Sequence, residues 1–308
     1  MDKFEKSALF FLLIIALLPV LLISADSSAY WIRVLSSTLM LSALVLAQNI
    51  LLGYTGYPAF GAVAFFGIGG YTTAVMMSKL QLPFWFSFIT SGLVATFCAL
   101  IIAVPLMRLK SHYFAITTLA LQLALMELVS NLELTGGSYG INLPIYRGFL
   151  ESYLFFYLFW SLVFFSYLLN LYIDKSVLGY AFKAIREDEE AAASLGVNTL
   201  LFKSLSFAVM ALITGSAGSI YAYWITYIDP PSMFDPLLSV KIFVALLIGG
   251  IGTTSGPLLG AFFLEIFSEL LWSEFPRFHG VLLGILVVIT VFLLPRGVLG
   301  FISKSPSP

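Results

Sequence analysis

The sequence predicts an all-α protein that crosses a membrane with about ten helices. Hydrophobic residues make up 60% of the 308 residues and charged residues only 10%, whereas a soluble domain carries about 25% charged residues. The mean hydropathy of +1.01 leaves too little polar surface to cover a water-soluble globule. The composition therefore predicts one transmembrane domain over 1–308, and the net charge of −1 favours no nucleic-acid partner.

Apolar runs of membrane-spanning length follow one another along most of the chain. Crossing the hydrocarbon core takes roughly 20 residues of α-helix. The qualifying runs are about 7–24, 34–52, 58–78, 84–107, 113–131, 151–173, 200–226, 237–250, 251–271 and 279–295. The eighth run is short and the ninth follows almost at once, so either could be a broken or half-spanning helix, and about eight to eleven spans remain open.

The first apolar run also resembles a secretory signal peptide. Lys3 and Lys6 precede it, and Ser24-Ala25-Asp26 follows it as a possible cleavage site. We expect it to stay uncleaved as the first span, because the topology derived from charge requires it.

The distribution of positive charge predicts the orientation in the membrane, because cytoplasmic loops carry an excess of Lys and Arg. With the N-terminus inside, the cytoplasmic positive residues are Lys3, Lys6, Arg108, Lys110, Lys175, Lys183, Arg186, Lys203, Arg296 and Lys304. The external ones are Arg33, Lys79, Arg147, Lys241 and Arg277, which makes ten against five of the fifteen. Both termini and the loop 174–199 are therefore expected in the cytoplasm.

The loop 174–199 is the longest between spans and predicts two short helices. Leu178, Phe182 and Ile185 form one apolar stripe at helical spacing. Asp188 is placed to cap a second helix, which Gly196 and Asn198 would end. A charged, two-piece helical loop suits docking into a soluble partner, and an amphipathic segment lying on the membrane is the alternative.

Glycines and a proline interrupt the second and third spans at Gly53-Tyr54-Thr55-Gly56-Tyr57-Pro58. Backbone groups freed inside a membrane need protein or a water-filled cavity around them, so the segment is either part of a transport path or an interfacial turn. Further small residues at a spacing of four indicate close helix packing. These are Gly252, Gly256 and Gly260, and Ala211, Gly215 and Ser219.

Polar side chains within the spans are few, and such residues tend to face a pathway or a packed interior. With Thr55 and Gly56 from the interrupted segment, the candidates for a translocation path are Gln48, Asn49, Thr117, Thr118, Gln122 and Glu127. Glu265 and Glu269 lie four residues apart on one helix face, near the external end.

Motifs of catalysis and metal binding do not stand out. The sequence contains no Gly-Lys pair, so it carries no P-loop for ATP. His112 and His279 lie far apart, and the single cysteine, Cys98, allows no disulfide. We therefore expect no enzyme activity, bound metal or cofactor in this chain.

Several segments resemble the LivM-type permeases of branched-chain amino-acid ABC transporters. They are GYTGYPAFGAVAFFGIGGYTTA (53–74), HYFAITTLALQ (112–122), LTGGSYGI (134–141), AIREDEEAAASLGVN (184–198), GGIGTTSGPLLGA (249–261) and LPRGVLG (294–300). They occur in the family's order and cover most of the chain from 50 to 300.

The resemblance implies a multi-pass permease subunit in the inner membrane that imports branched-chain amino acids. It implies a heterodimer with a second, related permease, two cytoplasmic ATPases that bind ATP and Mg²⁺, and an extracytoplasmic substrate-binding protein. The family's coupling loop maps onto the cytoplasmic loop, and the residues expected to meet the ATPase are Lys183, Arg186, Glu187, Asp188, Glu189 and Gly196.

One departure leaves the substrate open. Where many members of the family read Gly-Gln-Leu-Ser-Leu-Gly, this chain reads Gly56-Tyr57-Pro58-Ala59-Phe60-Gly61 and so lacks a Gln and a Ser. Related permeases serve urea and amides, so another substrate is one alternative. An ion-coupled secondary transporter is the other, and it would need acidic residues near the membrane midplane.

Overall fold

The computed structural model describes residues 3–22, 28–146, 151–274, 281 and 284–285, and the fold over these residues is all-α, as predicted. The long helices are α1 (Lys3–Leu22), α2 (Ser28–Gln48), α3 (Val63–Ser78), α4 (Phe84–Leu106), α5 (Ser111–Asn131), α6 (Glu151–Lys175), α9 (Thr199–Ile225), α11 (Pro236–Gly249) and α12 (Gly256–Glu274). The short elements are the π-helix η1 (Asn49–Tyr54), the 3₁₀ turns η2 (Glu133–Thr135) and η3 (Gly137–Tyr139), β1 (Ile141–Asn142), α7 (Val177–Glu187), α8 (Glu189–Ser194), β2 (Tyr227–Ile228) and α10 (Pro230–Met233).

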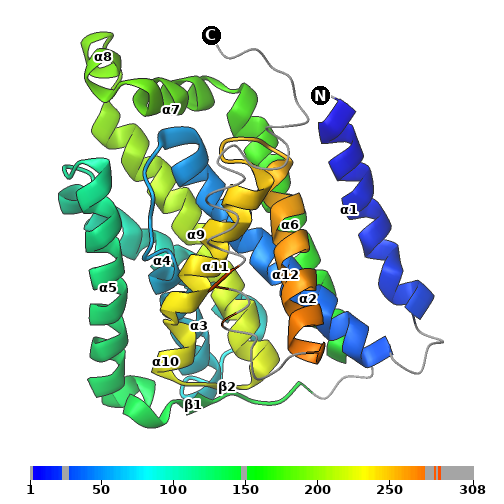
Figure 1. Ribbon diagram of the computed structural model, residues 1–308. Helices are drawn as coiled ribbons and strands as arrows, with labels where there is room; N and C mark the ends of the chain where they lie inside the picture. Colours follow the sequence, from blue (N-terminus) through cyan, green and yellow to red (C-terminus); the bar gives the residue numbers. More distant parts are fainter. Residues whose placement is uncertain (1–2, 23–27, 147–150, 275–280, 282–283, 286–308) are drawn as a thin grey trace.

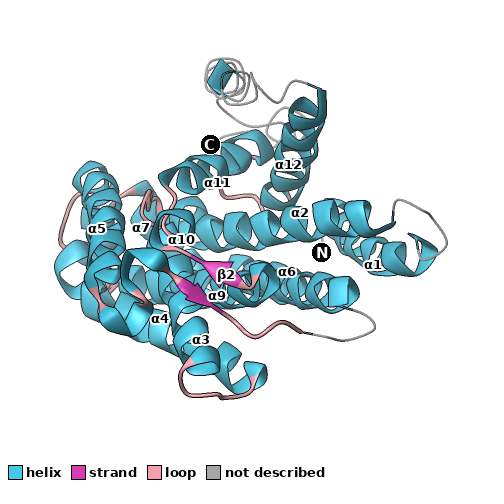
Figure 2. Ribbon diagram, turned by 90° about the horizontal axis from the view of Figure 1, so that it is seen from below, coloured by secondary structure: helices cyan, strands magenta, loops and turns pink. Residues whose placement is uncertain are grey.

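The helix formed by α2 and η1 lies at the centre of the bundle, and 89% of its most apolar stretch is buried inside the protein. It packs against α6, α9, α11 and α12, while α9 also packs along α3 and α4. In the outer helices α4 and α5, only 33% and 28% of the most apolar stretch is buried inside the protein. Figures 1 and 2 show these two helices on the opposite side of the molecule from α1.

Close helix packing depends on glycine where α3 crosses α9. A Cβ atom on Gly69 would stand 2.0 Å from the carbonyl oxygen of Gly215, and one on Gly218 would stand 2.0 Å from that of Phe66. Small residues let helix backbones approach this closely in a membrane. The prediction that Gly215 lies at a close contact between helices is therefore confirmed, and the residue that it faces is Gly69 on α3.

Each of the first nine apolar runs corresponds to a helix, and the tenth, 279–295, falls almost entirely outside the described residues. Six of the described helices are long and apolar enough to cross a membrane. The eighth run forms the 14-residue helix α11, and the ninth forms α12 after a turn at Gly250. The interruption after the second span begins later than predicted, because Gly53 still lies within the π-helix η1.

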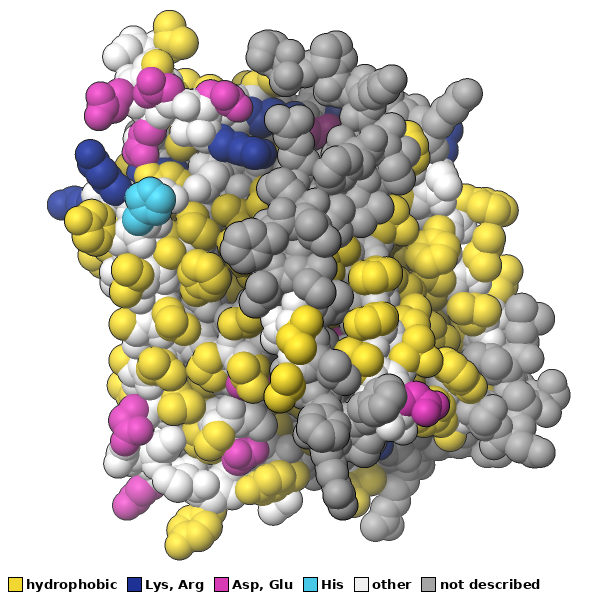
Figure 3. All heavy atoms as spheres, viewed as in Figure 1, with side chains coloured by type: hydrophobic (Ala, Val, Ile, Leu, Met, Phe, Trp, Pro, Cys, Tyr) yellow, Lys and Arg dark blue, Asp and Glu magenta, His cyan; other side chains and the backbone are white. Residues whose placement is uncertain are grey.

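The two ends of the bundle differ in structure. One end, called here the α7–α8 end, carries both short helices of the loop 174–199 at the top of Figure 1. The other, the hairpin end, carries α10 and the antiparallel pair in which Ile141 faces Ile228. Figure 3 shows mostly hydrophobic side chains across the middle and charged ones towards the two ends, the distribution that a bilayer selects.

Replacing Gly69 by alanine should destabilise the protein, because the new methyl group collides with the backbone of α9. Overpacking of this kind costs about 1–3 kcal/mol, so we expect a lower thermal unfolding temperature for the purified protein in detergent. Thr72→Ala is the matched control, because the Thr72 hydroxyl donates only to the Ile68 carbonyl oxygen of its own helix. Equal unfolding temperatures for Gly69→Ala and the wild type would contradict the close contact.

Candidate functional site

The helix α7 packs its apolar stripe onto the bundle at the α7–α8 end. Phe182 and Ile185 are buried, and the Phe182 ring meets the Phe202 ring edge-on at 6.2 Å between centroids. Ser176 caps the helix, since its hydroxyl accepts a hydrogen bond from the Gly179 amide at 3.3 Å. The predicted amphipathic helix is confirmed, and its apolar face contacts protein.

The second helix, α8, begins and ends as the sequence predicts. The Asp188 carboxylate accepts hydrogen bonds from the amides of Glu190 at 2.9 Å and Ala191 at 3.0 Å. Gly196 follows the helix with a φ of 88°, a conformation that glycine adopts without strain. Asn198 begins the next helix, because its side chain caps α9 through the Leu201 amide.

A buried lysine joins α8 to the bundle. Lys203 of α9 is 3% exposed, and its ammonium group lies 2.5 Å from a carboxylate oxygen of Glu189. The same group donates to the Met107 carbonyl oxygen at 2.7 Å and the Tyr57 hydroxyl at 3.1 Å. The Tyr57 hydroxyl donates to the other Glu189 oxygen at 2.5 Å. These contacts connect α8 with α9, the end of α4 and the segment after η1.

The charge on Glu189 is stabilised in this setting. Burial alone raises the pKa of its carboxyl group, but the hydrogen bonds from Lys203 and Tyr57 outweigh that effect and the pKa is lowered. Burial and the neighbouring carboxylate raise the pKa of Tyr57, so its hydroxyl keeps the proton that it donates. An ionised acceptor with two donors is a strong hydrogen-bond arrangement.

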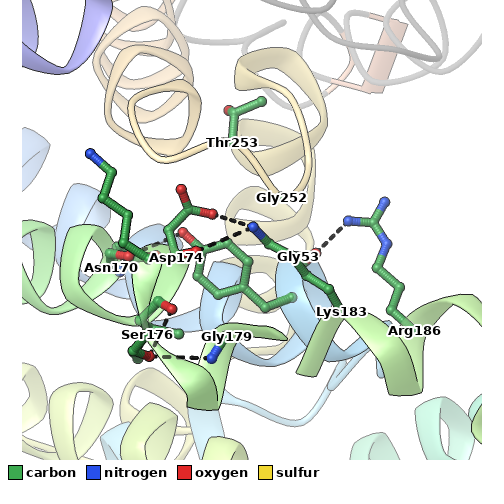
Figure 4. A network of polar contacts seen from close by, with 12 residues as sticks. Gly53, Asn170, Asp174, Ser176, Gly179, Lys183, Arg186, Gly252 and Thr253 are labelled. Atoms are coloured by element: carbon green, nitrogen blue, oxygen red, sulfur yellow. Dashed lines mark hydrogen bonds and ion pairs between the residues drawn. The ribbon is translucent and has the colours of Figure 1, made fainter. Parts of the chain in front are cut away.

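Arg186 of α7 reaches the end of the central helix. Its Nη1 atom donates to the Gly53 carbonyl oxygen in η1 at 2.5 Å, as Figure 4 shows. Gly56, with a φ of 76°, and Gly252, with a φ of 79°, leave room for this side chain. A Cβ atom on Gly252 would stand 2.4 Å from Arg186 Nη1. Gly53, Gly56 and Gly252 thus all contact the one residue Arg186.

Two asparagines hold the same region from the other side. Asn49 donates to the Asn170 side-chain oxygen at 3.0 Å and accepts from the Gly252 amide at 3.0 Å. Asn170 of α6 in turn donates to the carbonyl oxygens of Leu46 and Ser166. The network ties η1, α6 and the turn before α12 together, and fully bonded buried networks rigidify a core.

Lys183 pairs with an acid at the end of α6. Its ammonium group lies 2.6 Å from an Asp174 carboxylate oxygen and 5.8 Å from the centre of the Tyr54 ring. Figure 4 shows this pair beside Gly53 and Gly252. The side chain therefore anchors α7 to α6 and, through the Tyr54 ring, also lies against η1.

A cavity of about 740 Å³ opens at the α7–α8 end. Its walls are the segment 107–111 after α4, the segment 55–57 after η1, and residues of α7, α8 and α9. Arg186, Asp188 and Glu189 from the predicted coupling set line it, and so do Thr55 and Gly56 from the predicted path. Glu187 and Gly196 are exposed nearby on the same loop.

The remaining candidates for the path are dispersed. Gln48 is buried and donates to the Ala59 carbonyl oxygen at 3.2 Å, and Thr118 accepts from the Gly61 amide at 3.4 Å. Gln122 is also buried and bonds the Phe234 carbonyl oxygen at 3.0 Å and the Ser239 hydroxyl at 3.0 Å. Thr117 bonds within its own helix, and the exposed Glu127 pairs with Asn131. Their role in a translocation path therefore stays a prediction.

Sequence reasoning missed Lys203, Tyr57 and Asn170. One signal for Lys203 was available, because a lysine inside the apolar run 200–226 requires a partner in a membrane. Tyr57 stands at the departure from the family pattern, where it replaces an amide side chain. Among the described residues, no group of three or more His, Cys, Asp and Glu side chains gathers as metal ligands do.

Replacing Glu189 by glutamine should destabilise the protein in a pH-dependent way. The carboxylate contributes stability above its unfolded pKa of 4.5, and that contribution is lost as the pH falls through the lower folded value. At pH 7 we expect an unfolding temperature lower by at least about 2 °C. The difference from the wild type should shrink below pH 4.5, as thermal scans in detergent can measure.

Glu187→Gln provides the control, because Glu187 is exposed at the end of α7. It should leave the unfolding temperature and its pH profile unchanged. A gap between the wild type and Glu189→Gln that stays constant down to pH 3 would contradict the paired carboxylate.

Comparison with known proteins identifies the family of this chain. The family model of the branched-chain amino acid transport system permease component matches residues 30–291. The LivM permease protein of Salmonella typhimurium is 29% identical over 96% of this chain and 75% of its own length, and that of Escherichia coli is 30% identical over 85% and 68%. The LivH permease protein of Salmonella typhimurium is 27% identical over 66% and 63%. The chain therefore belongs to the family of permease components of branched-chain amino acid transport systems, which are multi-pass membrane proteins.

Proposed function

We propose that this chain is the permease subunit through which an ABC importer moves branched-chain amino acids across the inner membrane. The names of its relatives support the transport function and the substrate class. The observation that carries the mechanism is the hydrogen bond from Arg186 to the Gly53 carbonyl oxygen. Through this hydrogen bond, movement of the loop 174–199 by a cytoplasmic ATPase reaches the central helix of the bundle.

In the proposed orientation the α7–α8 end faces the cytoplasm. Among the described residues, Arg108, Lys110, Lys175, Lys183, Arg186 and Lys203 lie at or beside this end. Lys79 lies at the hairpin end, where it donates to the Glu133 carbonyl oxygen, and Arg33 and Lys241 lie towards the same end. This asymmetry supports a cytoplasmic α7–α8 loop. With the nine long helices and the run 279–295, it supports about ten spans with both termini inside.

The partners are a second permease, two ATPases and an external binding protein. Both LivM and LivH permease proteins are similar to this chain, which supports a heterodimer of two related subunits. ATP and Mg²⁺ bind in the ATPases, and this chain works as one permease domain without catalysis. The cavity of about 740 Å³ beside α7 and α8 supplies a concave surface for ATPase docking.

Coupling passes from the loop 174–199 into the spans by two routes. Arg186 transmits motion to η1, a π-helical segment of the kind often found at functional sites. Glu189 transmits motion through Lys203 to α9. The ATPase must bind the outward-open and inward-open states with different affinity, since only that difference shifts their equilibrium.

Replacing Arg186 or Asp188 by alanine should uncouple transport while the subunit stays in the membrane. Arg186→Ala removes the contact with η1, and Asp188→Ala removes the α8 cap at a cost of about 1 kcal/mol. We expect ATP-driven leucine uptake into proteoliposomes holding all subunits to fall at least about tenfold for Arg186→Ala, which corresponds to about 1.4 kcal/mol.

Ser194→Ala is the matched control on α8, because the exposed Ser194 hydroxyl donates only to the Glu190 carbonyl oxygen of the same helix. Normal uptake in both Arg186→Ala and Asp188→Ala would overturn the coupling assignment. ATP-driven uptake of another solute but not of leucine would overturn the substrate, and uptake driven by an ion gradient alone would overturn the ABC mechanism.

A further inference from the structure

A second cavity, of about 580 Å³, lies between the central helix and the helices α9, α11 and α12. It is formed by residues near the start of α2 and α11 and near the end of α9 and α12, so it lies towards the hairpin end. This is the end opposite the coupling loop. Small-molecule sites in proteins commonly occupy about 300–1,000 Å³.

Charges of both signs line this cavity. Arg33, Lys241, Glu265 and Glu269 contribute to its wall, and all four belong to helices of the bundle. Ionisable side chains within membrane helices are costly and mark substrate pathways or binding sites. Two cations and two carboxylates at one cavity therefore indicate a polar or charged ligand.

The internal contacts of these groups leave one cation available. Glu269 accepts a hydrogen bond from the Tyr30 hydroxyl at 2.8 Å, and Lys241 lies 3.4 Å from Glu265. The guanidinium of Arg33 forms no ion pair or hydrogen bond with any residue that the structure describes. A planar guanidinium of this kind can bind a carboxylate with two parallel hydrogen bonds.

The rest of the wall offers apolar surface. Val34 and Met40 of α2 and Trp224 and Ile225 of α9 line the same cavity. The Glu269 carboxylate, which has acceptor positions beyond the one that Tyr30 uses, can take an ammonium group. The cavity thus combines a carboxylate-binding cation, an ammonium-binding acid and an apolar wall.

We propose that this cavity is the binding site for a zwitterionic aliphatic amino acid on its way through the permease. Arg33 binds the α-carboxylate, Glu269 binds the α-ammonium group, and Met40 and Trp224 contact the side chain. This inference deepens the proposed function, on which its substrate class depends. The position at the hairpin end suits receipt of the amino acid from an external binding protein.

The central helix connects this cavity with the coupling loop. Arg33 lies near one end of α2, and Gly53, which accepts from Arg186, lies 20 residues further along the same helix and its π-helical continuation. At 1.5 Å per residue the two positions are roughly 30 Å apart along the helix. Movement of η1 by the ATPase would therefore change the cavity wall.

Protection of an engineered cysteine tests the proposal directly. Cys98 is the only cysteine in the chain, so Cys98→Ala gives a background for Ser37→Cys, which places a thiol in the cavity wall. The importer, purified with its partner subunits, is labelled with a water-soluble thiol reagent. We expect millimolar L-leucine to slow labelling of this cysteine at least about twofold, as half or more occupancy of a single site requires.

Two analogues and a second cysteine sharpen the result. Leucinamide, which lacks the carboxylate, and 4-methylpentanoate, which lacks the amine, should protect at least about tenfold more weakly, because each forfeits one charged hydrogen bond. Ser138→Cys, on the exposed hairpin-end turn η3 outside the cavity, should label at the same rate with and without leucine.

Variants of Arg33 distinguish a role in binding leucine from a role in contacting the second permease. Arg33→Gln should raise the leucine concentration for half-protection about tenfold or more, and Arg33→Lys should restore part of the affinity. Loss of co-purification with the second permease in Arg33→Gln would overturn the proposal in favour of a subunit interface. Equal labelling of Ser37→Cys with and without leucine would also overturn it.

The two proposals fail in different ways. If the wild-type importer takes up leucine with ATP but leucine does not protect Ser37→Cys, the cavity assignment is wrong and the transport function stands. If leucine protects the cysteine but ATP drives no leucine uptake, the cavity binds the amino acid and the proposed importer function is wrong.

Discussion

The hydrogen bond from Arg186 to the Gly53 carbonyl oxygen is the contact on which the α7–α8 end of the structure depends. The last carbonyl groups of a helix lack partners within the helix, and a cation there also interacts favourably with the helix dipole. The central helix ends inside the bundle, so water cannot serve this carbonyl group as it would at a surface. The Arg186 side chain from the loop 174–199 satisfies it, and the loop is thereby held against the buried core.

This contact explains the glycines around it. Gly56 and Gly252 both have positive φ, and a Cβ atom on Gly252 would overlap the guanidinium group. The segments around these two glycines lie nearly 200 residues apart in sequence, yet both must be free of side chains for the arginine to reach η1. Asn49 fixes the same turn by accepting from the Gly252 amide. The glycines at these two positions are thus explained by one contact between distant segments.

The pair formed by Lys203 and Glu189 has a different physical basis. A buried ion pair adds little net stability when it is compared with apolar packing, but losing one partner strands a buried charge at a cost of several kcal/mol. Such a pair therefore enforces one geometry of α8 against α9 and resists partial opening. Arg186 and the pair of Glu189 with Lys203 contact different helices, so the loop is joined to both η1 and α9.

The sequence alone determined the membrane class, the helical fold and the two-piece loop with its Asp188 cap. These features are local or compositional: hydropathy, helical periodicity and capping each depend on residues within a few positions of one another. The tertiary structure decided that Lys203 and Tyr57 bind Glu189, that Gly69 faces Gly215, and that Gln48 and Gln122 each donate to a backbone carbonyl oxygen of another segment. It also placed Arg33 and Glu269 around one cavity. Those facts depend on which helix faces which, and helix pairing comes from backbone approach and side-chain fit between separate segments, most of them more than a hundred residues apart, which no local pattern encodes.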